Sequence, residues 1–318
     1  MHHTNDVAIY VTTTRADYRH AKALIASIEA RSSCRRIWIV PDDDHREPTM
    51  FGYPVWRPTD PRVLRLDGYY KKLRVFWGPA ERFMHCDADQ LALRDLDPLL
   101  DRLATLPRPF FLANLSTRVH DDWQNGDRRR VFIHRAGDPE LLRKFDATYD
   151  WERWFPFNSG EFSASRDAVD QQLLLDVYEE ASARHAELTP GRPMMRSRDG
   201  MFMSDQGFLN YFINRWCPAV NVEWIENLYL WGGLEERLPP ASPETSAFRG
   251  ALIHWAGCNR PGPLPVPTGV PHARDWRRYH RAYCRSRGDW RGFLRDVSEQ
   301  IVRVTRDFVS GVKRRLVR

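Results

Sequence analysis

A short apolar segment that ends in two aspartates, RFMHCDAD at residues 82–89, decides the fold class. The apolar side chains of Phe83, Met84 and Cys86 predict a short buried strand at 82–86. Asp87 and Asp89 follow at once, so both carboxylates lie where that strand ends. Two carboxylates one residue apart can bind one hard cation and leave positions for substrate phosphates. In an exposed loop, two aspartates at this spacing would usually form an acidic turn exposed to solvent. Because a buried strand precedes them here, a metal site is as good an interpretation as an acidic turn.

The chain on the amino-terminal side of this strand alternates between strand and helix patterns. β-branched and aromatic residues predict strands at 7–14 and 36–40, and apolar residues at helical spacing predict helices at 16–30 and 68–77. This alternation is typical of an α/β fold with parallel strands. Because ligands bind at the carboxyl ends of strands in such sheets, we expect the site to lie at the two aspartates.

The rest of the chain is less regular. Polar residues rich in Arg and Asp at 112–154 predict an excursion from the core. A return strand is predicted at 157–163, the clearest amphipathic helix at 168–187, and a last short strand at 252–255.

Composition indicates a globular protein. The chain has 318 residues, of which 42% are hydrophobic and 12% aromatic, enough for a sizeable core. No apolar run approaches the ~18 residues needed to cross a bilayer, and no secretory signal is visible. The five cysteines are scattered and form no C-x-x-C pair, which favours a reducing compartment and excludes a structural zinc site of the usual spacing. We expect a cytoplasmic protein.

The net charge of +6 is unevenly distributed. Residues 272–318 contain 14 basic and 5 acidic side chains, a net charge of +9, whereas the remaining residues contain 34 basic and 37 acidic side chains, a net charge of −3. Because the excess basicity is confined to the tail, the body is not built to bind nucleic acid.

A second chemical motif, HWAGCNRP, occupies residues 254–261. His254 follows Leu252 and Ile253, so it lies at a strand end, as Asp87 does. Gly257 has no Cβ and allows the backbone to approach a phosphate closely. Arg260 offers a planar fork of donors that suits a diphosphate. A single histidine here would be an ordinary half-buried side chain, but the combined motif favours metal and diphosphate binding.

These motifs resemble the retaining glycosyltransferases of GT-A fold that include glycogenin and the bacterial lipooligosaccharide galactosyltransferases. The similar segments appear in the order found in that family. They are Tyr10–Thr14 with Tyr18, Lys71-Lys72-Leu73, Asp87-Ala88-Asp89, Phe157-Asn158-Ser159-Gly160, Asp205-Gln206-Gly207-Phe208-Leu209-Asn210 and His254–Pro261. The resemblance implies a Rossmann-like mixed sheet flanked by helices that binds a nucleotide-sugar, in the family a UDP-sugar.

The resemblance also implies a role for each matching residue. The cation, Mn²⁺ or Mg²⁺, would be held by Asp87, Asp89 and His254. The diphosphate would be held by Gly257 and Arg260, the uracil or ribose by Thr12, Thr13 and Tyr18, and the rest of the donor by Lys72 and Asn158. Asp205 and Gln206 would be the catalytic residues beside the sugar, which would be transferred with retention of configuration to a glycan, lipid-linked or protein acceptor.

Several positions depart from the family pattern. Arg260 stands where a lysine is usual, and it keeps the charge but changes the phosphate geometry. Gly262 replaces a tryptophan, and Glu161 interrupts an otherwise apolar strand. Residues 116–154 have no recognisable counterpart, so we expect the acceptor site to differ from that of the family.

The domain organisation follows from composition. We expect one catalytic domain at 1–262, a Pro- and Gly-rich linker at 263–271 and a basic helical tail at 272–318. The tail carries an apolar stripe at helical spacing, formed by Phe293, Val297, Ile301, Val304, Phe308 and Val312. A basic amphipathic helix of this kind can lie on an anionic membrane, here at the inner face. The alternative is a terminal helix docked on the body or on a second subunit.

Two other functions remain open from the sequence. One is another reaction on a nucleotide-sugar, by a hydrolase or a nucleotidyltransferase. The long glycine-rich loop expected of a nucleotidyltransferase is missing after Val11. The other is a non-catalytic scaffold, and the presence of both aspartates with His254 argues against it.

Overall fold

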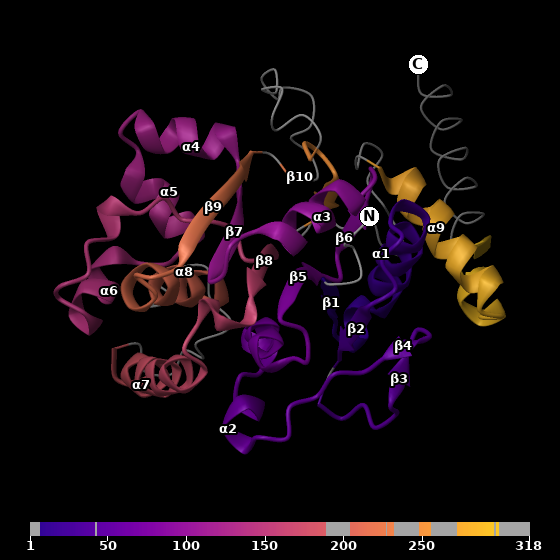
Figure 1. The fold of residues 1–318 in the computed structure, drawn as a ribbon, viewed down its shortest axis with the longest axis horizontal. Helices are drawn as coiled ribbons and strands as arrows, with labels where there is room; N and C mark the ends of the chain where they lie inside the picture. Colours follow the sequence, from indigo (N-terminus) through magenta and orange to yellow (C-terminus); the bar gives the residue numbers. More distant parts are fainter. Residues whose placement is uncertain are drawn as a thin grey trace, which may run out of the picture.

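The computed structural model describes residues 7–41, 43–188, 204–226, 228–231, 248–255, 272–295 and 297–298. Its centre is a six-stranded mixed sheet (Figure 1). In spatial order the strands are β2 (Ile37–Val40), β1 (Ala8–Thr12), β5 (Arg82–Asp87), β8 (Glu161–Ser165), β7 (Phe110–Leu115) and β9 (Asn221–Glu226). β1 is parallel to β2 and β5, whereas β8 is antiparallel to both of its neighbours.

A second sheet of three strands places His254 next to the two aspartates. Its order is β10 (Tyr229–Trp231), β11 (Leu252–His254) and β6 (Gln90–Ala92). β6 is antiparallel to β11, with Gln90 opposite His254. Because β6 begins directly after Asp89, the end of β11 is brought beside the aspartates. A further pair, β3 (Thr49–Met50) and β4 (Tyr53–Pro54), forms a small hairpin.

Helices cover the central sheet (Figure 1). The α-helices are α1 (Tyr18–Arg31), α2 (Pro61–Leu64), α3 (Asp97–Thr105), α4 (Thr117–Gln124), α5 (Arg128–Arg135), α6 (Pro139–Phe145), α7 (Gln171–Leu188), α8 (Asp205–Trp216) and α9 (Ala273–Ser286). Of these, α4, α5 and α6 lie beyond the β7–β9 side of the sheet (Figure 1). The 3₁₀ helices are η2 (Arg15–Asp17), η3 (Gly68–Trp77), η4 (Trp151–Arg153) and η5 (Arg166–Ala168). Residues 68–77, predicted as a helix, thus form the tighter 3₁₀ type.

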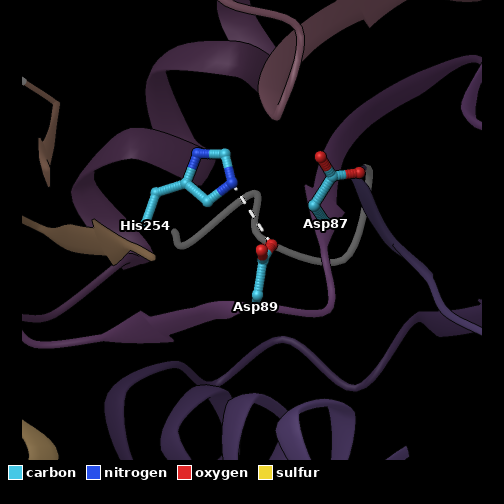
Figure 2. A group of neighbouring side chains, drawn as sticks. All are labelled: Asp87, Asp89 and His254. Carbon is cyan, nitrogen blue, oxygen red and sulfur yellow. Dashed lines mark ion pairs between the residues drawn. The ribbon is translucent and has the colours of Figure 1, made fainter. Parts of the chain in front are cut away.

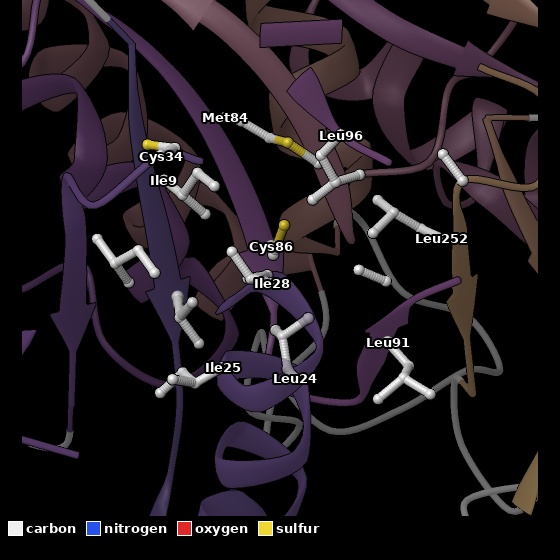
Figure 3. Close-up of a cluster of buried hydrophobic side chains, with 14 of the residues drawn as sticks. Ile9, Leu24, Ile25, Ile28, Cys34, Met84, Cys86, Leu91, Leu96 and Leu252 are labelled. Atoms are coloured by element: carbon white, nitrogen blue, oxygen red, sulfur yellow. The ribbon is translucent and has the colours of Figure 1, made fainter. Parts of the chain in front are cut away.

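Both faces of the central sheet are buried. In β1, Ile9 and Val11 belong to one core, and Ala8 and Tyr10 belong to the other. This alternation follows from strand geometry, since successive side chains point to opposite faces. Figure 3 shows part of the first core, where apolar side chains of α1 lie with those of β1 and β5.

The prediction for residues 112–154 is wrong in two respects. Residues 112–115 belong to β7, a central strand rather than an excursion. The following residues form α4, α5, α6 and η4, whose large side chains Trp123, Phe132 and Trp151 are buried in the second core. The predicted strand at 157–163 begins only at Glu161.

The first part of the basic tail packs on the body. α9 lies alongside α1 (Figure 1), and its apolar side chains Trp276, Tyr279 and Tyr283 are buried in the first core. An ion pair of 2.5 Å joins Lys22 of α1 to Asp289. Of the two alternatives for the tail, a helix on a membrane or a helix docked on the body, the structure shows the docked helix for α9.

Residues 299–318 of the tail lie outside the described residues. The linker 263–271 lies outside them, and so does the stripe from Ile301 to Val312. In the part of the chain that the structure describes, no helix is long and apolar enough to span a membrane.

Candidate functional site

Asp87, Asp89 and His254 come together at the junction of the two sheets (Figure 2). One ligand atom from each lies within 4.8 Å of the others. His254 Nε2 is 3.2 Å from Asp89 Oδ1, and the backbone N–H of Trp255 donates to the carbonyl of Asp89 at 3.0 Å. The three residues predicted as metal ligands from the sequence therefore form one cluster.

The chemistry of this cluster suits a hard divalent cation. Two carboxylates and one imidazole supply oxygen and nitrogen ligands, and a set of three leaves coordination positions for phosphate oxygens and water. Asp89 and His254 are buried, and Asp87 is partly open. Burial raises the pKa of Asp87 to about 6, with Lys72 opposing the shift and Asp89 adding to it. Two carboxylates held this close repel each other unless a cation offsets their charge, and with the imidazole of His254 they fit a hard divalent cation.

The F-N-S-G segment forms the wall behind the metal ligands. Asn158 Oδ1 accepts a hydrogen bond of 2.8 Å from the N–H of Gly160. The carbonyl of Gly160 accepts from the N–H of Asp87 and from Nε2 of Gln90, both at 2.9 Å. Asn158, predicted to contact the donor, therefore uses its carboxamide oxygen to shape this turn.

Lys72 links the metal ligands to α8. Its ammonium lies 2.9 Å from Asp87 Oδ2 and 2.9 Å from Asp205 Oδ2. It also donates to the carbonyl of Ser159 at 3.3 Å. Burial disfavours the charged ammonium, but the carboxylates of Asp205 and Asp87 outweigh it and raise the pKa of Lys72 above its usual value.

The predicted catalytic residues Asp205 and Gln206 are the first two residues of α8. Ser204 caps this helix by accepting from the N–H of Gly207 at 2.9 Å. Ser159 Oγ donates to Asp205 Oδ2 at 3.0 Å, and the Ser159 N–H donates to Gln206 Oε1 at 3.2 Å.

The carboxamide of Gln206 is also held from the far side. Its Nε2 donates to the carbonyl of Arg135 at 2.5 Å. Since Arg135 ends α5, the segment without a family counterpart contacts a predicted catalytic residue directly. Nothing in the sequence near Gln206 indicates this contact, because the two residues are 71 positions apart.

The residues predicted to bind the nucleoside occupy the β1 side of the site. Thr12 lies opposite Asp87 in the parallel pairing of β1 and β5. Thr13 is buried, and its N–H donates to the carbonyl of Val40 at 3.0 Å. Tyr18, the first residue of α1, packs edge to face on Phe51 with ring centroids 5.5 Å apart.

His85 is a buried neighbour of the site that the motifs do not reveal. Its Nε2 is 3.0 Å from Thr12 Oγ1 and 3.8 Å from Asp87 Oδ1, and its ring stacks on Phe162. Burial, with the charges of Lys72 and His254, lowers the pKa of His85 well below its usual value, so the imidazole is neutral. It can therefore position Thr12 without adding charge.

Gly257 and Arg260, predicted to hold the diphosphate, lie outside the described residues. Their roles stay predictions. Both follow His254 closely in the chain, within six residues of a ligand whose position is described.

Known structures, rather than known sequences, are similar to this chain, which matches no protein-family model and no curated protein. The crystal structure of the galactosyltransferase LgtC in complex with donor and acceptor sugar analogs has a TM-score of 0.52 at 14% identity, covering 86% of this chain and 95% of LgtC. The bifunctional glycosyltransferase WbbM has a TM-score of 0.49 at 14% identity, covering 86% of this chain and 49% of WbbM. GlyE of Streptococcus pneumoniae TIGR4 has a TM-score of 0.47 at 12% identity, covering 86% of this chain and 60% of GlyE.

The similarity to LgtC extends over nearly the whole of both chains, whereas this chain spans about half the length of WbbM. The chain therefore has the fold of LgtC, a GT-A fold with a mixed sheet flanked by helices, and the predicted fold class is confirmed.

Proposed function

We propose that this chain, with its GT-A fold, is a metal-dependent glycosyltransferase that moves a hexose from a UDP-sugar to an acceptor hydroxyl. One observation carries the proposal. Asp87 at the end of β5, Asp89 in the turn after it and His254 at the end of β11 converge within 4.8 Å, and the buried Lys72 joins Asp87 to Asp205 at the start of α8. A structural acidic turn would need neither the imidazole nor the lysine.

The chain's own residues suit the parts of this reaction. Asp87, Asp89 and His254 would hold a divalent cation, whose positive charge offsets the charge that develops on the leaving diphosphate. Gly257 would let the backbone approach that diphosphate, and Arg260 would donate to it.

The sugar would lie between the metal ligands and α8. Asp205 and Gln206 stand at the amino-terminal end of that helix, with Ser159 holding both side chains. From there they would orient the sugar and stabilise positive charge on it as the diphosphate departs. Thr12, Thr13 and Tyr18 would surround the nucleoside, with Lys72 and Asn158 nearer the phosphates and sugar. Attack by the acceptor on the face that the diphosphate leaves would retain the configuration.

The acceptor would be a glycan or a lipid-linked glycan. The basic tail supports the second choice, because anionic lipid headgroups attract Lys and Arg side chains. Trp290 and Leu294, one helical turn apart, are 59% and 61% exposed beyond α9. Two exposed apolar side chains among arginines are typical of a surface that contacts a membrane, at the inner face in this proposal.

Binding of nucleotide-sugars tests the proposal most directly. Thermal unfolding would be followed with a panel of nucleotide-sugars, with and without Mn²⁺, because a ligand that binds the folded state raises its apparent stability. We expect stabilisation by UDP-sugars that requires Mn²⁺ and disappears in Asp89→Asn. Release of UDP only when an acceptor is added would identify a transferase, whereas release with water alone would identify a hydrolase. If no nucleotide or nucleotide-sugar stabilises the protein, the proposal is wrong.

A further inference from the structure

The ammonium of Lys72 occupies the centre of the described site. It has two carboxylate partners, Asp87 Oδ2 and Asp205 Oδ2, each at 2.9 Å. Two oxygens of Ser159 complete its surroundings, the carbonyl at 3.3 Å and Oγ at 3.4 Å. The Lys72 side chain is 6% exposed, so water contributes little. A buried charge is tolerated only when it is paired and hydrogen-bonded, and here four acceptors meet it.

This arrangement sets Lys72 against any divalent cation. Asp87 would give its carboxylate to the cation, yet one oxygen of that carboxylate already pairs with Lys72. Like charges in a buried site repel strongly, because little solvent screens them. A cation bound beside Asp87 must therefore overcome repulsion from the Lys72 ammonium. It must also share the Asp87 carboxylate with that ammonium.

We infer that Lys72 is the counter-cation of the metal-free site: it neutralises Asp87 and Asp205 and lowers the affinity for a divalent cation until a diphosphate binds. The inference rests on the proposed metal site. A diphosphate brings new negative charge, which offers Lys72 another partner and lets Asp87 turn fully to the cation. Lys72 thereby makes the binding of metal and of diphosphate mutually favourable. It also keeps Asp205 paired at the start of α8 while Asp87 changes partner.

The neighbouring lysine provides a matched control. Lys71 is also buried, and its charge acts on Asp43. Lys71 and Lys72 are adjacent in η3, so a substitution at either changes the same helix. Lys72 is the lysine that forms ion pairs with both Asp87 and Asp205.

The experiment measures Mn²⁺ binding to the full chain by the electron paramagnetic resonance signal of free Mn²⁺, with and without UDP. Lys72→Met removes the charge and keeps most of the side-chain volume, Lys72→Arg keeps the charge, and Lys71→Met is the control. Without UDP we expect Lys72→Met to bind Mn²⁺ on the order of ten-fold more tightly than the natural protein. Lys72→Arg and Lys71→Met should stay within about two-fold of it. UDP should strengthen Mn²⁺ binding less in Lys72→Met than in the natural protein.

Each outcome decides between the alternatives. Unchanged or weaker Mn²⁺ binding by a folded Lys72→Met would overturn the inference while leaving the metal site intact. Absence of Mn²⁺ binding by both the natural protein and Lys72→Met, with UDP present, would overturn the metal site and the inference together. If Lys72→Met does not fold, Asp205→Asn provides the same test with opposite sign. In this variant Lys72 loses the carboxylate of Asp205 and pairs more strongly with Asp87. Mn²⁺ should therefore bind more weakly, and unchanged Mn²⁺ binding would count against the inference.

Discussion

Gly160 touches the imidazole of His254 so closely that a Cβ on Gly160 would lie 2.2 Å from Cε1 and 2.8 Å from Nδ1. Any side chain at position 160 must therefore displace the ring and disturb its contact with Asp89, whose Oδ1 is 3.2 Å from Nε2. We expect Gly160→Ala to weaken Mn²⁺ binding about ten-fold or more, since residues that orient a metal ligand contribute on that scale. Titration of the protein with Mn²⁺, followed by the signal of the free ion, measures this.

A double substitution shows whether the effect acts through the ring. In a His254→Ala background the imidazole is gone, so adding Gly160→Ala should cost little further Mn²⁺ affinity. If Gly160→Ala lowers the Mn²⁺ affinity equally with and without His254→Ala, the effect does not act through the imidazole of His254.

If Asp87 and Asp89 bind a divalent cation as proposed, sugar transfer should depend on that cation. Asp89→Ala should lose nearly all turnover while the protein stays folded, because its backbone carbonyl still accepts from Trp255 and only the ligand is removed. Chelation should abolish transfer, and Mn²⁺ or Mg²⁺ should restore it. The measurement is UDP release with a responsive acceptor, accompanied by circular dichroism of the variant. Full activity in excess EDTA would contradict the metal assignment.

Glu161 predicts an unusual pH dependence of stability. It is fully buried in β8, and burial raises its pKa from 4.5 to about 8. Its Oε1 accepts from Ser163 Oγ at 3.3 Å, and among the described residues its Oε2 has no hydrogen-bond partner. The unfolded chain loses this proton at lower pH than the folded one. The free energy of unfolding should therefore fall as pH rises from about 4.5 to about 8, by on the order of 5 kcal/mol in total.

Glu161→Gln removes the ionisation and keeps the shape. The variant should match the natural protein in stability near pH 5 and exceed it by a few kcal/mol, on the order of 2–5, near pH 8.5. Urea unfolding at the two pH values measures the difference. A gap that is the same at both would show that Glu161 does not stay protonated in the folded protein.

The sequence predicts that Asp87, Asp89 and His254 come together, because these residues lie at or directly after strand ends. Asp87 ends β5, and His254 ends β11. Carboxyl ends of strands converge in an α/β fold, so local patterns were sufficient there. The strand predicted at 157–163 begins only at Glu161, and the reason is a local hydrogen bond that composition does not reveal. Asn158 uses its side chain to bind the N–H of Gly160, which holds a turn where extended backbone was expected.

Other parts of the site depend on contacts between distant segments. The Arg135 carbonyl fixes Gln206, and Lys72 bridges Asp87 and Asp205, but no periodicity or motif encodes either contact. The prediction for residues 112–154 fails because the many charged residues of this segment hide its aromatic side chains. Trp123, Phe132 and Trp151 follow no regular spacing in the sequence and come together in the folded core.

Arg260 provides a test of the diphosphate site outside the described residues. If its guanidinium donates to the diphosphate, Arg260→Ala should weaken binding of UDP more than binding of uridine. The lost charge-assisted hydrogen bonds should be worth about 1.5–3 kcal/mol. Calorimetric titration with the two ligands in the presence of Mn²⁺ measures the difference. An equal loss for both would assign Arg260 a structural role.

The docking of α9 determines where the basic tail can be cut. Truncation after Pro271 would remove Trp276, Tyr279 and Tyr283 from the first core, so we expect it to destabilise the body. Truncation after Ser298 keeps α9 and the ion pair between Asp289 and Lys22 of α1. It removes residues 299–318, which contain six basic and two acidic side chains and most of the apolar stripe. Truncation after Ser298 therefore tests membrane binding by the tail without removing the part of the tail that packs in the core.

Co-sedimentation with anionic vesicles, at low and high salt, tests the membrane role of the tail. The full chain should bind at low salt and release as salt rises, because attraction to lipid charge acts within about a Debye length, ~8 Å at physiological salt. The form that ends at Ser298 should bind more weakly yet keep its melting temperature and its UDP affinity. Trp290→Ala with Leu294→Ala in the full chain should also weaken binding, whereas Tyr69→Ala, at an equally exposed aromatic residue of η3, should not. Equal sedimentation of the full and truncated chains at both salt concentrations would rule out membrane binding by residues 299–318.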